Sequence, residues 1–292
     1  MKFNLTRIAP TPSGFLHLGN AYSFLLTQAL AEKTGAKILL RIDDLDRERY
    51  RKEYVQDIFD SLDFLEISID QGPKNLSDFE QEWSQIHRLP LYQNALQKLS
   101  DSNQLFACTC SRKKIQSMDS SGYYLGHCLD RKIPLDRAEA AWRINTLTAD
   151  LIELCAFPDH KIIQPIPLDT SFFIVRKKDQ MPSYHLASLV DDQHFEVDFI
   201  IRGMDLLSSS LAQSYLSEVI DFKNFKYSTF YHHSILKDRK RKKLSKSEGA
   251  TSLQHLRKNG KNLSDVLGLI GELMGSPAPI STMNEFKNLL NF

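Results

Sequence analysis

The sequence predicts an α/β fold in which a parallel sheet forms the first domain and a smaller α+β domain is inserted into it. Three observations support this prediction. Strand and helix patterns alternate over residues 5–41, a different pattern follows, and strand and helix patterns later return. Alternating strands and helices build parallel sheets, and a returning pattern indicates a discontinuous domain. We therefore expect a first domain at 1–72 with 182–250, an inserted domain at 73–181, and a short helical extension over 251–292.

The N-terminal region carries one strand–helix–strand unit. A strand is expected over 5–10, a loop with Pro and Gly over 11–19, a helix over 20–34 and a second strand over 37–41. Apolar residues three and four positions apart predict the helix. In open α/β sheets ligands bind beyond the carboxyl ends of the strands, so the loops after these two strands are expected to flank a site.

The rest of the chain adds amphipathic helices and further strands. Helical spacing of apolar residues predicts the helices, and runs of apolar and β-branched residues predict the strands. The expected helices cover 54–65, 90–99 and 264–274, the strand-like segments cover 140–146 and 172–178, and a strand followed by a helix is expected over 194–207 and 210–220.

Composition limits the class of protein. Lys and Arg total 37 and Asp and Glu total 36, yet the stretch KDRKRKKLSKSEG at 237–249 concentrates basic residues, as a local face for a polyanion would. The N-terminus lacks the apolar core of a signal peptide, and no run reaches the roughly 18 apolar residues of a membrane span. We therefore expect a cytoplasmic protein with no membrane partner.

The motif HLGN, His17 to Asn20, lies in the loop between the first strand and the helix. Backbone N–H groups and the helix dipole favour an anion at a helix N-terminus, and Gly19 would let a phosphate approach the backbone. The alternative is a surface turn with a helix cap at Asn20, because H-x-G is common.

A second motif, KLSKS, spans Lys243 to Ser247. Its lysines could neutralise charge that develops on phosphates during a transfer reaction. The alternative is a solvated run of charge, or a nucleic-acid patch without catalysis.

Together, HLGN and KLSKS resemble the paired signatures of class I aminoacyl-tRNA synthetases, whose catalytic domain is a Rossmann-like fold. The segments RIAPTPSGFLHLGN, RIDDLD, YHLASLVDD and IIRGMDLL are similar to those of glutamyl-tRNA synthetases and cover most of the chain through Thr251. The resemblance implies catalysis by His17, Asn20 and Lys246. It also implies that ATP, with Mg²⁺, is bound by His17, Gly19, Asn20, Lys243 and Lys246.

The same resemblance implies a glutamate site. The positions that match the family's substrate-binding residues are Arg7, Asp43, Tyr184 and Arg202. An arginine fork pairs bidentately with a carboxylate, and a dicarboxylate needs more than one such partner. The alternative for the two arginines is a structural salt bridge with Asp43 or Asp44.

Two positions depart from the glutamyl pattern. Asp43 stands where the glutamyl family usually has Glu for the substrate's α-amino group, and the related glutaminyl enzymes carry Asp at this place. Ser188 stands where full-length glutamyl enzymes tend to have Asn. Both departures bear on amino-acid specificity.

The cysteines suggest a metal site. Four cysteines in a chain of this length do not form a disulfide framework, and Cys108, Cys110 and Cys128 supply three ligands for a tetrahedral zinc. From the residues alone His127 would be the fourth ligand, with Tyr124 as the alternative. Three buried free cysteines without a metal are the other alternative.

The pattern C-x-C, Y-x3-C resembles the zinc site of the glutamyl-queuosine tRNA(Asp) synthetase subfamily, truncated paralogues in which a tyrosine completes the set. This resemblance implies that Tyr124 is the fourth ligand of one structural zinc per chain. About forty residues follow Thr251, so no anticodon-binding domain is expected.

The subfamily resemblance implies a ligase that activates glutamate with ATP and transfers it to queuosine in the anticodon loop of tRNA(Asp). Lys243 and Lys246 would then serve ATP, and the basic residues of 237–242 would meet the RNA backbone. The alternatives are the same activation with another acceptor, such as a tRNA 3′ end, a small molecule or a carrier protein, and a non-catalytic RNA-binding paralogue. We expect a monomer.

Overall fold

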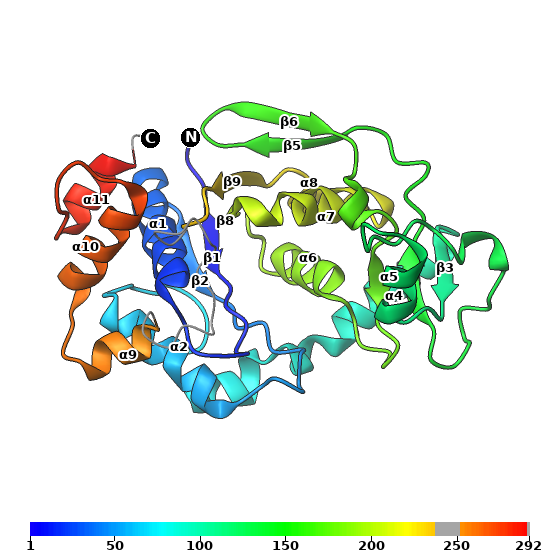
Figure 1. Cartoon of the computed structure of the whole chain (residues 1–292), viewed down its shortest axis with the longest axis horizontal. Coiled ribbons are helices and arrows are strands. Elements are labelled where there is room, and N and C mark those ends of the chain that lie inside the picture. The colour runs from blue at the N-terminus through cyan, green and yellow to red at the C-terminus, as the bar shows by residue number, and fades with distance from the viewer. Residues whose placement is uncertain (237–251, 291–292) are drawn as a thin grey trace. The chain divides into compact units, whose positions relative to one another are not determined.

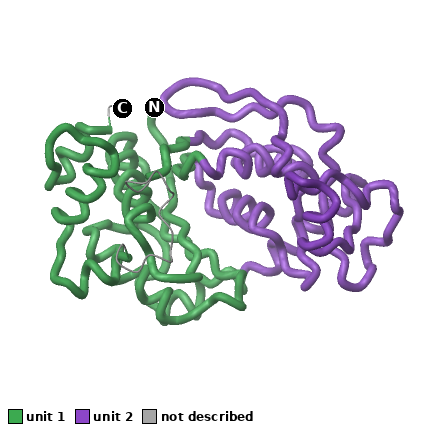
Figure 2. Tube along the Cα trace, in the orientation of Figure 1, with its two compact units in different colours: residues 1–87, 199–204, 231–292 green, residues 88–198, 205–230 purple. Residues whose placement is uncertain are grey.

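The computed structural model describes residues 1–236 and 252–290. The chain divides into two compact units, coloured separately in Figure 2. Unit 1 comprises Met1–His87, Phe199–Met204 and Tyr231–Phe292, and unit 2 comprises Arg88–Asp198 and Asp205–Phe230. The boundaries of these units differ from the domain boundaries expected from the sequence, which stay a prediction.

Unit 1 contains a parallel sheet and the helices that cover it (Figure 1). Its elements are β1 Leu5–Ile8, α1 Leu18–Thr34, β2 Lys37–Leu40, α2 Lys52–Phe64, α3 Leu76–Asp78, β8 Phe199–Gly203, α9 Leu253–Lys258, α10 Leu263–Met274 and α11 Met283–Leu289, with a π-helical turn at Phe79–Trp83. Strand β1 pairs in parallel with β2, from Leu5–Lys37 to Ile8–Leu40, and in parallel with β8 through Thr6–Phe199. The strand–helix–strand unit predicted from the sequence is confirmed, and α1 is its crossover.

Helix α1 is apolar over most of its circumference because it is buried on two sides. Leu25, Leu26 and Leu30 are each 0% exposed, and the helix contacts β1, β2 and β8 as well as α10. A helix that is apolar all round is expected where neighbours cover more than one face. The core of unit 1 therefore lies around α1 and fixes the position of its first turn, where the HLGN motif lies.

Unit 2 is mainly an antiparallel sheet with helices. Its elements are α4 Leu89–Asp101, β3 Leu105–Cys108, α5 Arg112–Met118, β4 Ala141–Ile144, β5 Ile152–Ala156, β6 His160–Gln164, β7 Ile174–Arg176, α6 Tyr184–His194, α7 Leu207–Val219 and α8 Lys223–Lys226, and the strand β9 Thr229–His233 begins there and ends in unit 1. Short 3-10 helices lie at Gln85–Arg88, Leu129–Arg131, Leu168–Thr170 and Met204–Leu206. The strand order β3-β4-β7 forms one antiparallel sheet.

A buried ion pair joins Arg88, the N-cap of α4, to α6 within unit 2. Asp191 is 0% exposed, and its two carboxylate oxygens accept from Arg88 Nε at 2.7 Å and Nη2 at 3.0 Å. The Tyr92 hydroxyl donates to the same carboxylate at 2.7 Å. A buried carboxylate needs such partners to remain charged. Asp191 therefore locks α6, the helix that begins at Tyr184.

Among the described residues, the helices are too short or too polar to cross a lipid bilayer.

Candidate active site and metal centre

The HLGN motif forms the start of α1. His17 is the N-cap: its Nδ1 accepts from the Gly19 amide at 3.1 Å, and the Asn20 side chain accepts from the His17 amide at 3.1 Å. The cap is therefore His17, with Asn20 as its reciprocal partner. Because Nδ1 accepts a hydrogen bond, the neutral imidazole carries its proton on Nε2, where it can donate to an anion.

The absence of a side chain at Gly19 leaves room for the His17 imidazole. A Cβ atom added at Gly19 would lie 2.9 Å from Cε1 and 3.1 Å from Nδ1 of His17. Any larger residue would therefore displace the imidazole. This steric requirement stands beside the close phosphate approach expected from the sequence.

The loop residue before His17 is held from two elements. The Leu16 amide donates to Asp57 of α2 at 3.1 Å, and the Leu16 carbonyl accepts from the Leu253 amide of α9 at 2.8 Å. Arg257 of α9 in turn donates to Asp57 at 2.7 Å. Because the His17 backbone also bridges to Ser252, α9 is fastened to the HLGN loop.

The loops after β1 and β2, which the sequence nominated to flank a site, are hydrogen-bonded to each other. The Arg41 amide donates to Ile8 O at 2.9 Å, and the Asp43 amide donates to Pro10 O at 2.9 Å. The Arg41 guanidinium grips the Asp43 carboxylate with two contacts, Nε–Oδ1 at 2.7 Å and Nη2–Oδ2 at 3.0 Å. Sequence reasoning missed Arg41, although its place at the end of the strand motif RIDD was a usable signal.

Arg41 and Asp43 form a buried ion pair. The Arg41 side chain is 2% exposed and the Asp43 side chain 9%. A bidentate guanidinium compensates a buried carboxylate and also fixes its orientation. An ionised carboxylate accepts hydrogen bonds and donates none, so the chemistry of Asp43 suits an ammonium group.

Arg7 on β1 and Arg202 on β8 are buried on neighbouring parallel strands, with exposures of 5% and 4%. Arg7 Nη1 donates to Ile201 O at 3.1 Å. Burial, followed by the charges of Arg202 and Arg7 among other causes, lowers the pKa of His232 to about 3. The positive charges of the two arginines therefore disfavour protonation of His232.

Tyr184 belongs to unit 2, whereas Arg7, Asp43 and Arg202 belong to unit 1. It is the first residue of α6, next to the N-cap Ser183, and is 45% exposed. Ser188, one of the two departures from the family pattern, is 1% exposed in the same helix. Its small hydroxyl therefore sits where a longer amide would need space.

The basic motif lies outside the described residues. This applies to Lys243 and Lys246 and to the remaining basic residues of 237–242. Lys246 precedes Ser252, the residue paired with His17, by only a short stretch of sequence.

The three predicted cysteine ligands come together in unit 2. The sulfur atoms of Cys108, Cys110 and Cys128 all lie within 4.8 Å of one another, and all three residues are buried and free of disulfides. The Cys110 and Cys128 sulfurs are 3.6 Å apart. Two thiolates bound tetrahedrally to one zinc at 2.3 Å would be about 3.8 Å apart. The cluster therefore fits a metal ion of this size.

Tyr124 lies against this cluster. Its phenol oxygen accepts from the Cys128 amide at 2.8 Å, and burial together with hydrogen bonds to Cys108 and Cys128 raises the pKa of Tyr124. Burial raises the pKa of Cys128, but hydrogen bonds from Tyr124, Cys110 and Cys108 outweigh it and lower that pKa overall. Burial raises the pKa of Cys110 to about 11.

His127 is placed differently. Among the described residues the group of possible metal ligands consists of the three cysteines, and His127 is not part of it. Its ring packs against the Tyr124 ring, with centroids 5.6 Å apart. The oxygen of Tyr124, rather than a nitrogen of His127, is therefore the donor next to the sulfurs.

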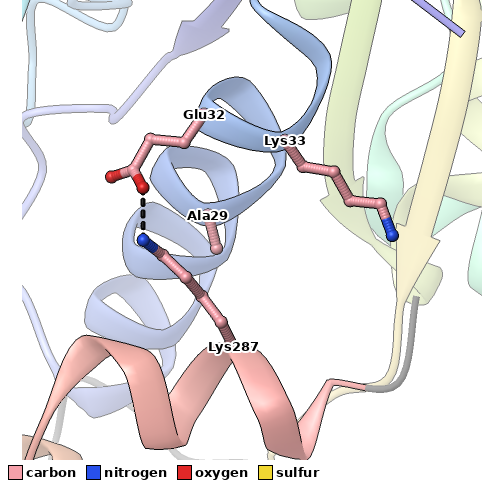
Figure 3. A pocket seen from close by; sticks show the side chains of 4 residues that line it. All are labelled: Ala29, Glu32, Lys33 and Lys287. Atoms are coloured by element: carbon pink, nitrogen blue, oxygen red, sulfur yellow. Dashed lines mark hydrogen bonds and ion pairs between the residues drawn. The ribbon is translucent and has the colours of Figure 1, made fainter.

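A surface pocket in unit 1 is separate from these residues. Figure 3 shows that it lies between α1 and α11 and is lined by Ala29, Glu32, Lys33 and Lys287, with an ion pair between Glu32 and Lys287. It contains none of the residues that the sequence nominated for a site.

Comparison with known proteins identifies the family of this chain. The family model described as tRNA synthetases class I (E and Q), catalytic domain, matches residues 5–136 and 153–287. The histidine-capped loop after the first parallel strand is thus that of a class I tRNA synthetase. The chain belongs to the family of glutamate (E) and glutamine (Q) enzymes within that class.

Individual relatives agree with the family. The Glutamyl-Q tRNA(Asp) synthetase of Methylococcus capsulatus is 32% identical, over 91% of this chain and 82% of its own. Glutamate–tRNA ligase 2 of Syntrophus aciditrophicus is 28% identical over 96% of this chain, which spans 60% of that protein's length. A glutamate tRNA ligase structure from Elizabethkingia meningosepticum has the same fold, with a TM-score of 0.74 at 20% identity, over 98% of this chain and 64% of that one.

Proposed function

We propose that this chain activates glutamate with ATP and transfers the glutamyl group to queuosine in the anticodon loop of tRNA(Asp). The observation that carries the activation step is the set of buried charges in unit 1, namely Arg7, Arg202 and the Arg41–Asp43 pair, in the same unit as the His17 loop. The acceptor rests on the 32% identity with a Glutamyl-Q tRNA(Asp) synthetase.

In the activation step, an oxygen of the substrate's α-carboxylate attacks the α-phosphorus of ATP. The new P–O bond forms as the bond from that phosphorus to the bridging oxygen breaks, and pyrophosphate leaves. Mg²⁺ bound with ATP neutralises phosphate charge. The protein needs no nucleophile, so positioning and charge neutralisation account for its contribution.

The described residues have distinct tasks in this step. Arg7 and Arg202 bind carboxylate oxygens of glutamate, and Asp43, oriented by Arg41, accepts from its ammonium group. Tyr184 contributes a hydroxyl to the same substrate. His17 Nε2 donates to a phosphate oxygen, since its Nδ1 is engaged by Gly19.

Lys243 and Lys246, outside the described residues, are assigned to ATP, with Lys246 near the developing charge between the α- and β-phosphates.

In the transfer step, a queuosine hydroxyl attacks the carbonyl carbon of glutamyl adenylate. A C–O ester bond forms, the bond to AMP breaks, and the hydroxyl proton passes to solvent or to the departing phosphate. The basic residues of 237–242 supply sequence-independent contacts to the RNA backbone.

The metal of the proposal is zinc, one per chain, held by Cys108, Cys110, Cys128 and Tyr124. Sulfur-rich tetrahedral sites select zinc, and a site with four protein ligands is structural. The zinc would hold the end of β3 to the segment that contains Tyr124 and Cys128. Metal analysis should find about one equivalent in the purified protein and much less in Cys110→Ser.

A tRNA 3′ end is the second candidate acceptor, because the glutamate–tRNA ligase of Syntrophus aciditrophicus is also similar over 96% of the chain. Glutamate-dependent ATP–pyrophosphate exchange, followed by transfer of labelled glutamate to tRNA(Asp) with and without queuosine, separates the two. Labelling that requires queuosine supports the proposal. Labelling of unmodified tRNA that is lost on oxidation of its 3′ end favours the second candidate, and no exchange either with or without RNA would overturn both.

A further inference from the structure

We infer that Arg143 is a positioning residue of the metal centre, which holds the Tyr124 ring so that its phenol oxygen faces the three cysteines. The inference rests on the zinc site of the proposed function. It concerns a residue of β4 that lies outside the cysteine motif in the sequence.

Arg143 is stacked on the face of Tyr124. Its guanidinium carbon lies 3.7 Å from the centre of the Tyr124 ring, and the residue is 7% exposed. Arg143 Nη1 donates to Phe172 O at 2.8 Å. The guanidinium is therefore tied to the backbone on one side and to the ring face on the other, so that it fixes the plane of the ring.

Other aromatic rings and one hydrogen bond restrain the Tyr124 ring further. Phe106 and Phe172 each lie 6.3 Å away between ring centres, the first nearly parallel and the second edge-on. The phenol oxygen is held by the Cys128 amide at 2.8 Å. Arg143 on the ring face thus adds a restraint to a ring whose oxygen already lies beside Cys128.

The charge of Arg143 suits this place. Three thiolates around one Zn²⁺ leave a net negative charge in a buried cluster, and a buried charge is costly unless an opposite charge compensates it. Arg143 Nε is buried without a hydrogen-bond partner in the part of the chain that the structure describes. Stacking of the Arg143 guanidinium on the Tyr124 ring offsets the cost of burying this charge and its Nε, since the cation–ring attraction grows when water is excluded.

The same sheet contains a matched control. Arg176 of β7 stacks on Trp142 with its guanidinium carbon 3.8 Å from the ring centre, and its Nη2 donates to Leu135 O at 3.3 Å. Its Nε is likewise buried without a hydrogen-bond partner among the described residues. Arg176→Met thus removes the same kind of contact from a ring that belongs to no metal ligand.

The experiment compares Arg143→Met, Arg143→Lys and Arg176→Met. Zinc affinity is measured by competition with a chromogenic chelator, and the visible spectrum of the cobalt-substituted protein reports the ligand set. We expect Arg143→Met to weaken zinc binding roughly 10- to 100-fold, the usual cost of removing an outer partner of a metal ligand, and to alter the cobalt spectrum. Arg176→Met should stay within about twofold of wild type, and Arg143→Lys should restore part of the affinity.

A double variant tests whether Arg143 acts through Tyr124. In a Tyr124→Phe background, Arg143→Met should cause little further loss of zinc affinity, because the ligand that it positions is already gone. A full additional loss, or equal losses in Arg143→Met and Arg176→Met, would overturn the role of Arg143 while leaving the zinc site intact. A wild-type protein that binds no zinc would overturn the metal site and this inference together.

Discussion

The orientation of the Asp43 carboxylate is set by Arg41, two positions earlier in the chain. As a residue type it is one methylene shorter than the glutamate usual in the glutamyl enzymes, and under the proposed function it extends less far toward the substrate's ammonium group. The bidentate contact from Arg41, at 2.7 and 3.0 Å, sets where that shorter carboxylate points. A family motif identifies the position, but the orientation of its oxygens comes from the ion pair.

Arg41→Met should raise the KM for glutamate roughly 10- to 100-fold in ATP–pyrophosphate exchange, because a hydrogen bond to a charged group contributes about 1.5–3 kcal/mol. The KM for ATP should change little. Arg49→Met is the control, since Arg49 pairs with Asp46 in the same loop but is exposed. Equal increases in both KM values would mean that the loop is distorted and that Arg41 does not act through Asp43.

His232 makes folding sensitive to acid. Burial and the neighbouring positive charges, first Arg202 and then His233 and Arg7, lower the pKa of His232 from 6.5 to about 3 in the folded protein. Between these values the unfolded chain binds a proton that the folded chain does not, so the free energy of unfolding decreases as pH falls from about 6.5 toward 3.

The His232→Gln variant should therefore lose less stability than wild type between about pH 7.5 and about pH 4.5, by at most about 1.4 kcal/mol per pH unit. Thermal denaturation across this range measures the difference. His255→Gln, which changes an exposed histidine of the same unit, should follow wild type. Parallel pH profiles for all three proteins would contradict the assignment.

At the scale of elements, α9 is the helix that follows the basic motif, and its place is decided by contacts far away in sequence. Its Arg257 reaches Asp57 and Ser61 of α2, each at 2.7 Å, and Asp57 also accepts from Leu16. One buried carboxylate thus connects α2, α9 and the loop that carries His17. Helix α9, which follows KLSKS in the sequence, is thereby connected to the loop that carries HLGN.

We predict that Arg257→Met lowers ATP–pyrophosphate exchange about tenfold, mainly by raising the KM for ATP, because Asp57 loses its charged partner and the His17 loop is held less firmly. Titration of ATP in the exchange assay measures this. Lys258→Met is the control, since Lys258 is exposed and bonds only to Gln254 of its own helix among the contacts described. An equal loss in both variants would attribute the effect to α9 stability.

Elements with strong local patterns were predictable, and weaker ones were not. Helix α1 follows from apolar spacing, and β1 and β2 flank it as expected. The hairpin of β5 and β6 was missed, although Ile152, Leu154 and Ala156 alternate with more exposed residues. Five residues of alternation are a weak signal without knowledge of the partner strand.

At the scale of the whole molecule, the basic stretch 237–249 is proposed to bind two polyanions, ATP and RNA, through different residues. Lys246→Ala should reduce glutamate-dependent exchange roughly 10²- to 10³-fold, the cost of one lost charge-stabilising donor. The exchange rate without RNA measures this role directly. A loss of less than about threefold would remove Lys246 from catalysis.

Neutralising Arg239 and Arg241 should instead weaken RNA binding and flatten its dependence on salt, since each lost phosphate contact lowers the slope by about one. RNA-free exchange should be unchanged. Binding titrations at several salt concentrations test the prediction. A parallel loss of exchange would show that the two polyanions share these residues.

The family, the strand–helix–strand unit, the HLGN motif and the three cysteines could be recognised from the sequence alone, because each depends on residue types at short, fixed spacings. The side chains that hold those residues in place became known only from the fold. Arg41 beside Asp43 and Tyr124 beside the cysteines involve near neighbours, but Arg257 reaches Asp57 and Arg143 reaches Tyr124 across separate elements. Such contacts depend on how elements pack, and packing brings together residues whose spacing in sequence carries no signal.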